Sequence, residues 1–420
     1  MKRKGAEMKV LQLNCVYPVG STGKLVYEIH NALQSNGIES IVCYGRGEKV
    51  LEPNVYKTCG ELYSKWNNLI SRFTGMQYGG CFFSTNKLIS IIKKENPDIV
   101  HLHCINGYFV NIYRIVSWLK KSGIRTVLTL HAEFMHTANC SHAFECEKWK
   151  TGCGNCKQFR KETKSLFFDR THRSWLKMKA AFDGFDRLTV ISVSDWLMER
   201  AKQSPILADK THSVILNGLD TQIFKLYDTD ALRRQYGLEK EKIIFHVTPS
   251  FNDDPSYIKG GYYVLELAKR LANENVKFFV AGNYSPDLKC PENVVLLGKI
   301  KNQQELAKYY SMADVTLLTS KKETFSMVCA ESLCCGTPVV GFKAGAPERI
   351  FSSEFGIFVD YADIGQLETA VRQMLAKNIN KEEICKISQN KFSQSKMVSE
   401  YLRCYLGDAI EEENENTGQK

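Results

Sequence analysis

Short apolar runs alternate along the first half of the chain with longer segments whose apolar residues recur every three to four positions. The runs cover residues 8–14, 39–45, 98–104, 125–132 and 187–194. A run that is apolar throughout is typical of a strand covered on both faces. In the segments between the runs, apolar residues recur with the period of an amphipathic helix. The pattern therefore predicts a parallel sheet with helices packed on it.

The same alternation returns in the second half, without close repetition of the first. Its apolar runs cover residues 242–250, 276–283, 292–300, 313–320 and 337–342. Residues 203–220 contain a proline and a polar stretch, which predicts an interdomain connection. We therefore expect two doubly wound α/β domains, at 1–210 and 211–390. A helical segment at 391–410 and an acidic, disordered tail at 411–420 follow.

Composition agrees with a two-domain globular protein. The 420 residues exceed what one core usually supports, and the apolar fraction of 44% and charged fraction of 24% are ordinary. No apolar run approaches the roughly 18 to 20 residues of a membrane span, and the first residues lack a signal-peptide pattern. We therefore expect a cytoplasmic protein.

The formal charge of +10 favours anionic partners, namely phosphates, anionic lipid headgroups or nucleic acid. Residues 61–73 carry apolar side chains at helical spacing beside Lys65 and Arg72, and residues 159–182 mix basic and aromatic residues. Both stretches suit peripheral contact with an anionic membrane. The first also suits a helix packed on its own core, and the second a solvated basic face. No nucleic-acid-binding motif accompanies them, so we expect no nucleic-acid partner.

A loop rich in small residues follows the first predicted strand. Gly20, Ser21, Thr22 and Gly23 would let backbone N–H groups approach a diphosphate, although a flexible turn explains them equally well. The loop matches neither the Walker motif nor G-x-G-x-x-G, so it gives no support to an ATPase or a dehydrogenase.

Residues 319–342 predict a loop, a helix, a turn and a strand. Thr324 is the expected N-cap of a helix over 325–335, and Gly336 is the expected left-handed residue after it. The helix N-terminus would offer backbone N–H groups to a phosphate. These belong to Phe325, Ser326, Met327 and Val328. Glu323 precedes the helix and Glu331 lies about two turns along it. Two solvated carboxylates are the alternative interpretation.

The Glu-x7-Glu pair, placed between ADVTLLTS and CGTPVVGF, resembles the signature of the family 4 (group 1) glycosyltransferases. This resemblance implies the GT-B fold, in which two Rossmann-like domains face a cleft and the segment 391–410 returns to the first domain. It also implies a retaining enzyme with a nucleotide-sugar donor, UDP- or GDP-linked. No catalytic metal and no covalent nucleophile are expected.

The resemblance assigns roles to individual residues. Glu331 would hold the donor ribose, Glu323 and His131 the sugar hydroxyls, and Lys259 the diphosphate. The turn at Gly298 and Ile300 would meet the nucleobase, and the loop at Gly20–Gly23 would face the diphosphate. His101 and His103 receive no catalytic role.

Two positions depart from the family pattern. Ala132 follows His131 where the family often has Asp, and Glu133 is the candidate to replace it. Asp253 and Asp254 stand where the family usually has an Arg, so the diphosphate would rely on Lys259 and the helix terminus.

Four cysteines lie close together in the segment 136–156, at positions 140, 146, 153 and 156. The spacing of Cys140, Cys146, Cys153 and Cys156, which ends in Cys-Gly-Asn-Cys, predicts a closed structural Zn²⁺ site. Two disulfides or free thiols are the alternatives. Similar Cys-rich insertions occur in family members from bacterial capsule and exopolysaccharide clusters.

We therefore expect a glycosyltransferase that acts on a glycan or a lipid-diphosphate-linked acceptor in cell-surface polysaccharide biosynthesis. A GT-B nucleotide-sugar epimerase or hydrolase is the first alternative. A zinc-stabilised nucleic-acid-binding protein is the second, since it would explain the charge and the cysteines.

Overall fold

The computed structural model describes residues 8–407, which fall into two compact units. The first unit combines the chain up to Ile215 with the segment that starts at Val398, and the second runs from Leu216 to Met397. The division lies five residues after the predicted boundary at 210. The predicted acidic tail at 411–420 lies outside the described residues.

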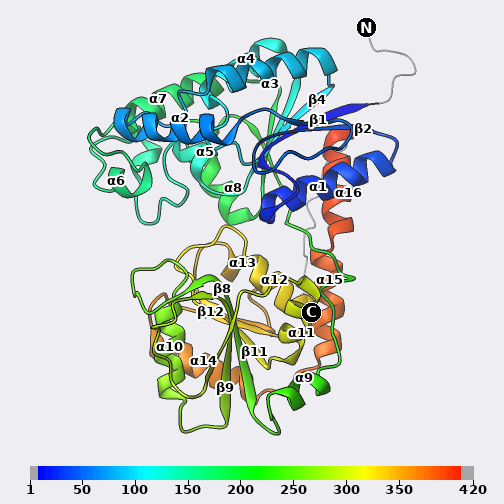
Figure 1. The fold of residues 1–420 in the computed structure, drawn as a ribbon, viewed down its shortest axis with the longest axis vertical. Coiled ribbons are helices and arrows are strands. Elements are labelled where there is room, and N and C mark those ends of the chain that lie inside the picture. Colours follow the sequence, from blue (N-terminus) through cyan, green and yellow to red (C-terminus); the bar gives the residue numbers. More distant parts are fainter. Residues whose placement is uncertain (1–7, 408–420) are drawn as a thin grey trace, which may run out of the picture. The chain divides into compact units, whose positions relative to one another are not determined.

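The first unit contains a seven-stranded parallel sheet in the order β3-β2-β1-β4-β5-β6-β7 (Figure 1). The strands are β1 Lys9–Val16, β2 Glu39–Arg46, β3 Val55–Lys57, β4 Ile99–Leu102, β5 Arg125–Leu130, β6 Leu188–Ser192 and β7 Thr211–Val214. The prediction of a parallel sheet is confirmed. β3 and β7 were not predicted, and β7 lies in the segment expected to be a connection between the domains.

Helices cover both faces of this sheet, as right-handed crossovers require. α1 packs on β1 and β2, whereas α3, α4 and α7 pack together on the other face (Figure 1). The helices are α1 Gly20–Ser35, α2 Glu61–Thr74, α3 Phe82–Glu95, α4 Ile112–Ser122, α5 Phe134–Thr137, the 3-10 turn Lys148–Lys150, α6 Phe159–Glu162, α7 Thr171–Phe182 and α8 Asp195–Lys202.

The second unit contains a six-stranded parallel sheet in the order β10-β9-β8-β11-β12-β13. The strands are β8 Lys242–Phe251, β9 Val276–Tyr284, β10 Val294–Gly298, β11 Val315–Leu318, β12 Val339–Phe342 and β13 Gly356–Val359. The five predicted strands are present, and β13 is an addition at the edge. Apolar residues of β8, β9 and β11 form the centre of the core, for example Ile244, Phe278 and Leu317.

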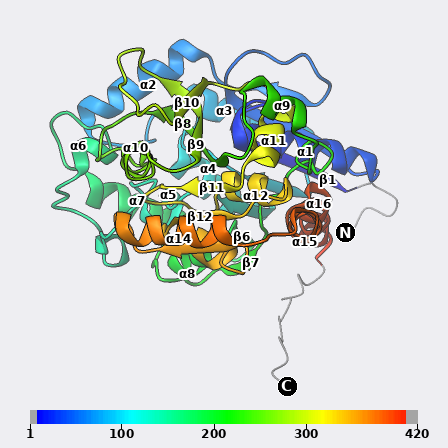
Figure 2. The same cartoon turned by 90° about the horizontal axis from the view of Figure 1, so that it is seen from below.

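The helices of the second unit lie on both faces of its sheet. α10 and α14 pack together on one side, and α11 and α12 lie on the other (Figures 1 and 2). The helices are α9 Asp230–Gln235, α10 Gly261–Arg270, α11 Gln303–Met312, α12 Met327–Cys334, α13 Pro347–Ile350, α14 Ile364–Ala376 and α15 Lys381–Phe392.

The last helix, α16 Gln394–Leu406, ends against the first unit. The hydroxyl of Tyr405 lies 2.6 Å from Nδ1 of His101, and the hydroxyl of Tyr401 lies 3.1 Å from Oγ1 of Thr129. Arg125 donates to the carbonyl of Tyr405 at 2.7 Å. The end of α16 is therefore anchored by buried polar contacts as well as by apolar packing.

Among residues 8–407, none of the helices combines the length and the apolar character that crossing a bilayer requires.

Candidate functional site

The predicted site residues gather at the carboxyl edges of the two sheets. In a doubly wound sheet, ligands bind where the strand order reverses, outside the carboxyl ends of the strands. In the second unit the reversal lies between β8 and β11, which are paired in parallel. Lys259 follows β8 and Glu323 follows β11, so both side chains come from the loops that flank this point.

Lys259 and Glu323 contact each other directly. The ammonium nitrogen of Lys259 lies 2.6 Å from Oε1 of Glu323, and the two side chains are 30% and 17% exposed. The sequence assigned these residues to neighbouring parts of one ligand, and the structure brings them together as an ion pair. Because both side chains are partly exposed, a bound ligand could replace Glu323 as the partner of Lys259. Neither charge would then be left buried and unpaired.

Gly260 holds the lysine loop against the strand-end loop of β11. Its φ is +68°, and a Cβ at this position would lie 2.1 Å from the carbonyl oxygen of Thr319. The Thr319 hydroxyl donates to the carbonyl of Lys259 at 3.1 Å, and the N–H of Lys321 donates to the carbonyl of Ile258 at 2.8 Å. Only glycine permits this approach, so Gly260 positions the lysine.

The backbone of Glu323 is paired with the loop after β12. Its N–H donates to Ala344 at 2.9 Å, and its carbonyl accepts from Ala346 at 3.2 Å. That loop is itself held by the carboxylate of Glu348, which accepts from the N–H groups of Ala344 and Gly345. Glu323 is therefore fixed at the backbone while its carboxylate projects from the loop. No motif in the sequence singles out Glu348 for this role.

Helix α12 begins two residues later than predicted. Ser326 is the N-cap, and its side chain accepts from the N–H of Cys329 at 3.4 Å. The expected N-cap Thr324 and the expected helical residue Phe325 lie before the helix. Gly336 does adopt the predicted left-handed conformation after the helix, with φ +79°.

Ser326 has φ +87° and ψ +92°, a backbone conformation that non-glycine residues rarely adopt. Such strain persists only where the surroundings impose it, and it is frequent at ligand sites. The Phe325 side chain is buried against Phe351 and Phe392, so only its backbone is available at the helix N-terminus. The N–H groups near Met327 and Val328 have no acceptor within the first turn of the helix.

Glu331 is oriented by a residue that sequence analysis missed. The hydroxyl of Tyr310 on α11 donates to Oε2 of Glu331 at 3.0 Å. Tyr310 is fully buried, and burial together with the charge of Glu331 raises the pKa of its phenol well above the usual range. The hydroxyl is therefore a permanent donor to this carboxylate. No periodicity in the sequence distinguishes Tyr310 from the neighbouring Tyr309.

The turn at Gly298 and Ile300 lies at the carboxyl end of β10, as predicted. Gly298 has φ +72°, and no atom would lie within 4 Å of a Cβ there. The turn is therefore open, at the same edge of the sheet as Lys259 and Glu323.

In the first unit, the predicted loop at Gly20–Gly23 is the first turn of α1. The expectation that these four residues form a loop before the helix is wrong, because the helix begins at Gly20. A Cβ on Gly23 would lie 3.1 Å from the carbonyl oxygen of Val16, and the Thr22 hydroxyl accepts from Asn14 at 3.3 Å. Ser21 lies in the same turn. Small residues thus allow the helix N-terminus to sit directly on the end of β1.

His131 follows β5 at the carboxyl edge of the first sheet. Burial lowers the pKa of its imidazole to about 4, and its ring stacks on His103 with centroids 5.8 Å apart. His103 and His101 are buried in the sheet, and Nε2 of His103 lies 3.3 Å from Oε1 of Gln12. Both are core histidines. His131 is therefore a neutral hydrogen-bonding group at neutral pH.

Glu133 does not occupy the position of a ligand-binding acid. Its buried carboxylate lies 2.5 Å from Nε of Arg200 and 3.6 Å from Nε2 of His136, and it accepts from the N–H of Ala143 at 2.7 Å. Burial acts to raise its pKa, but His136 and Arg200 outweigh burial and lower the pKa to about 2. The expectation that Glu133 replaces the family's Asp is therefore wrong, since it anchors the segment that follows α5.

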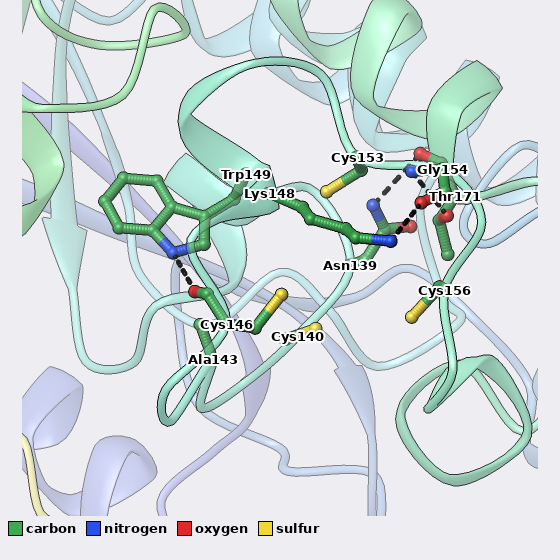
Figure 3. Close-up of a pocket in the computed structure, with 10 residues that line it drawn as sticks. All are labelled: Asn139, Cys140, Ala143, Cys146, Lys148, Trp149, Cys153, Gly154, Cys156 and Thr171. Carbon is green, nitrogen blue, oxygen red and sulfur yellow. Dashed lines mark hydrogen bonds between the residues drawn. The ribbon is translucent and has the colours of Figure 1, made fainter.

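All four cysteines of the 136–156 segment line one cavity of about 20 Å³ in the first unit (Figure 3). They are Cys140, Cys146, Cys153 and Cys156, and none is in a disulfide. Within residues 8–407, no three His, Cys, Asp or Glu side chains stand together as a ready metal site. Burial raises the pKa of the Cys153 thiol to about 12.

Two family models match consecutive parts of this chain. The model of the glycosyltransferase family 4 matches residues 22–223, and the model of the glycosyl transferases group 1 matches residues 228–392. The two matches adjoin each other along the chain and correspond to the two units. The chain belongs to the family 4, group 1 glycosyltransferases.

Two relatives of this glycosyltransferase match along almost its full length. A protein of Escherichia coli strain K12 that is named a colanic acid biosynthesis glycosyl transferase, WcaC, is 22% identical, with 95% of this chain and 99% of the relative covered. The N-acetyl-alpha-D-glucosaminyl L-malate synthase of Bacillus anthracis is also 22% identical, with 96% and 98% covered.

Solved structures share the fold of this glycosyltransferase. Anabaena Alr3699/HepE, solved in complex with UDP, has a TM-score of 0.63 at 16% identity, with 95% of this chain and 100% of that chain covered. WaaG, a glycosyltransferase involved in lipopolysaccharide biosynthesis, has a TM-score of 0.62 at 14% identity, with 95% and 100% covered. The predicted GT-B fold is confirmed.

Proposed function

We propose that this glycosyltransferase moves a sugar from a nucleotide-sugar donor to a glycan or lipid-linked acceptor with retention of configuration, in the assembly of a cell-surface polysaccharide. The observation that carries the proposal is the ion pair of Lys259 and Glu323 beside the N-terminus of α12. A cation, a carboxylate and a row of backbone donors suit a sugar diphosphate.

In this proposal the donor diphosphate takes over the ammonium of Lys259 from Glu323. The carboxylate of Glu323 is then released to accept hydrogen bonds from sugar hydroxyls, with His131 as a further sugar contact. Lys259 and the helix N-terminus stabilise the negative charge that develops as the bond between the sugar and the diphosphate breaks. They would supply the charge that a divalent metal supplies in other transferases, so we expect no requirement for a catalytic metal.

The nucleoside end of the donor would lie along α12 and β10. Glu331, held by Tyr310, would accept from the ribose hydroxyls, and the open turn at Gly298 and Ile300 would leave space for a base. A neighbouring fold, Alr3699/HepE, has been solved with UDP-glucose, with a TM-score of 0.61. This supports a uridine donor as the first to test.

The class of acceptor follows from the relatives. WcaC is named for colanic acid biosynthesis and WaaG for lipopolysaccharide biosynthesis, which supports a glycan or lipid-linked acceptor. A lipid-linked acceptor would place the enzyme at the inner face of the cytoplasmic membrane.

The test is thermal unfolding of the purified protein with UDP, GDP and ADP, followed by transfer assays with sugars of the nucleotide that stabilises it. A ligand bound only by the folded state raises the unfolding temperature by mass action. We expect one nucleotide series to stabilise the protein and the product to retain the anomeric configuration of the donor. Release of free sugar without transfer would instead indicate a hydrolase, and no stabilisation by any nucleotide would contradict the donor site.

A further inference from the structure

Helix α2 turns its apolar face outward. Its buried positions are polar, namely Ser64, Asn67 and Ser71, whereas Leu62 is 76% exposed and Trp66 64% exposed. The interpretation of this stretch as a helix packed apolar side inward is therefore wrong. A helix normally buries its apolar stripe, so an inverted helix indicates that the apolar stripe meets another surface.

Hydrogen bonds fix this inverted orientation. The hydroxyl of Ser64 donates to the carbonyl of Gly107 at 3.2 Å, and Oδ1 of Asn67 accepts from the N–H of Cys81 at 2.7 Å. Rolling the helix to bury Trp66 would leave these buried polar groups without partners, at a cost of about 1–3 kcal/mol for each group. The exposed apolar side is therefore built into the fold.

The apolar surface continues beyond α2 onto the segment after α6. The ring centroids of Phe73 and Phe167 lie 5.9 Å apart, and the N–H of Leu166 donates to the carbonyl of Arg72 at 2.8 Å. We call the exposed set the docking surface. It comprises Leu62, Trp66, Ile70, Phe73, Phe167 and Phe168.

Cations line a groove at the edge of the docking surface. Arg72, Arg160 and Lys164 surround a space of about 380 Å³ together with Phe167. Two of the nearby acids are engaged elsewhere, since Glu61 lies 2.9 Å from Arg46 and Asp169 accepts from the N–H groups of Cys156 and Thr171. A third acid, Glu162, stands on α6 between Arg160 and Lys164, so the cations outnumber it. The three cations can bind the phosphates of an anionic bilayer, and the exposed aromatic rings beside them can insert at the boundary of its acyl chains.

We propose that the docking surface binds an anionic lipid bilayer, with the apolar side chains at the acyl boundary and a lipid phosphate in the groove of Arg72, Arg160 and Lys164. This inference extends the proposed function, because it gives a lipid-linked acceptor a surface from which to enter. It does not depend on the donor chemistry, since all of its residues belong to the first unit.

Co-sedimentation of the full chain with vesicles tests the proposal. We expect binding to phosphatidylglycerol vesicles, at least tenfold weaker binding to phosphatidylcholine vesicles, and loss of binding at high salt. Trp66→Ser with Phe73→Ser should weaken binding at least tenfold, and so should Arg72→Gln with Lys164→Gln. Leu51 and Lys121 are exposed residues outside the docking surface. The controls Leu51→Ser and Lys121→Gln should therefore bind vesicles as the unchanged protein does.

Nucleotide-induced thermal stabilisation of each variant separates this inference from the proposed function. If a variant loses vesicle binding but is still stabilised by nucleotide, the docking surface binds vesicles and the donor site is intact. Equal binding to both kinds of vesicle, or no binding to either, would overturn the inference. A dimer that Phe73→Ser dissociates would also overturn it, because a second copy would then be the occupant. Salt-sensitive binding of RNA through the same residues, with no binding to vesicles, would likewise overturn the inference.

A separate observation concerns the four-cysteine cavity. The Cys-Gly-Asn-Cys turn holds three consecutive residues in left-handed conformations, with φ +53° at Cys153, +101° at Gly154 and +44° at Asn155. Lys148 donates to the carbonyl of Asn155 at 2.7 Å, which fixes the turn. A left-handed conformation is common for Gly and Asn but unusual for Cys153.

The four thiols face the space that they line (Figure 3), and a cavity of about 20 Å³ holds one water-sized particle. We infer that these thiols bind one structural Zn²⁺ ion, which would draw them together, because within residues 8–407 they do not stand as a ready metal site. As thiolates they would complete a closed tetrahedral site, which leaves no position for substrate. The ion would fasten the segment that follows His131, because Thr137, at the end of α5, bonds to Cys140 through its hydroxyl at 2.8 Å.

Elemental analysis of the full chain tests this site. We expect about one zinc per chain, its loss in Cys153→Ser, and its retention in Cys290→Ser, which changes a cysteine of the second unit. If Cys153→Ser does not fold, Co²⁺ exchange into the unchanged protein should give the visible absorption of a cobalt–thiolate site. Metal-free folded protein with four reactive thiols, or with two disulfides by mass spectrometry, would overturn the site.

Discussion

The ammonium of Lys259 lies 2.6 Å from the carboxylate of Glu323, although the two residues are 64 positions apart in the chain. The loops after β8 and β11 bring them together at the point where the strand order of the second sheet reverses. Because both side chains are partly exposed, the pair contributes about 1 kcal/mol or less to the free energy of unfolding. Its importance should therefore appear in activity and not in stability.

Replacing Glu323 with Gln should reduce sugar transfer about a hundredfold or more, because the amide cannot stabilise the same hydroxyl contacts or positive charge. The unfolding temperature should change little. Steady-state transfer and thermal unfolding check this, with the exposed Glu292→Gln as the matched control. Wild-type turnover in Glu323→Gln would show that the site is wrongly assigned.

Lys259→Met should raise the KM for the donor and lower kcat, because the ammonium acts on the diphosphate in both the ground state and the transition state. The double variant with Glu323→Gln should lose less than the sum of the two single effects, since the two groups share one contact. Lys308→Gln, exposed in the same unit, is the control. Strict additivity would argue against a shared role.

Tyr310→Phe should weaken nucleotide binding about tenfold with a smaller effect on kcat, because it removes a hydrogen bond to the charged Glu331. Titration calorimetry with the nucleotide that stabilises the protein measures this. The control is Tyr309→Phe. Tyr309 lies beside Tyr310 on α11, and its hydroxyl is hydrogen-bonded to Tyr236 and not to Glu331. Equal loss of affinity in both variants would mean that the effect is structural.

Gly260→Ala should destabilise the second unit by about 2 kcal/mol or more and reduce transfer, because a Cβ would lie 2.1 Å from the carbonyl of Thr319. Gly237→Ala is the control, since Gly237 also has a positive φ of 62° but no atom within 4 Å of its added Cβ. Urea unfolding compares the two variants. A similar loss in both would remove the special role of Gly260.

Acid should weaken the fold before its carboxylates are protonated. Burial lowers the pKa of His131 and of His246 to about 4, from 6.5 in the unfolded chain. The unfolded state therefore binds more protons, and stability present above pH 6.5 is lost as the pH falls toward 4. Each pKa unit corresponds to about 1.4 kcal/mol per histidine.

His101 and His103, which face His131, should act in the same direction, and the charge of Lys259 adds to the effect at His246. Urea unfolding at pH 7, 6 and 5 measures the change. Glu133 should not contribute in this window, because the pKa of its carboxyl is about 2 when folded and 4.5 when unfolded. A free energy of unfolding that stays constant from pH 7 to pH 5 would contradict the prediction.

The sequence predicted the elements whose pattern is local. Strands such as β5 and β8 are continuous apolar runs, and Gly336 ends α12 in the conformation that its lack of a side chain permits. β3 and β7 were missed because neither is a continuous apolar run: β3 is Val-Tyr-Lys and β7 is Thr-His-Ser-Val. Ser326 was missed as the N-cap because Thr324, two residues earlier, is also a capping residue by type.

The orientation of α2 shows where local pattern misleads. Leu62, Trp66 and Phe73 have the spacing of a buried stripe, but the partners of Ser64 and Asn67 lie at Gly107 and Cys81, far along the chain. Glu133 misled in a similar way. Its position after His131 suggested a ligand contact, whereas Arg200, 67 residues away, holds it in the interior.

The sequence by itself determined the two parallel sheets, the family, and the residue types at the candidate donor site, because each of these follows from short-range patterns of apolar, small and charged residues. Only the tertiary structure decided which of these residues meet. Lys259 meets Glu323 because β8 and β11 are neighbours in the sheet, and Tyr310 meets Glu331 because α11 packs on α12. The four cysteines share one cavity because the segment that follows α5 folds back on itself. Only the tertiary structure also decided which face of α2 is exposed, because burial depends on contacts between segments and not on spacing along one of them.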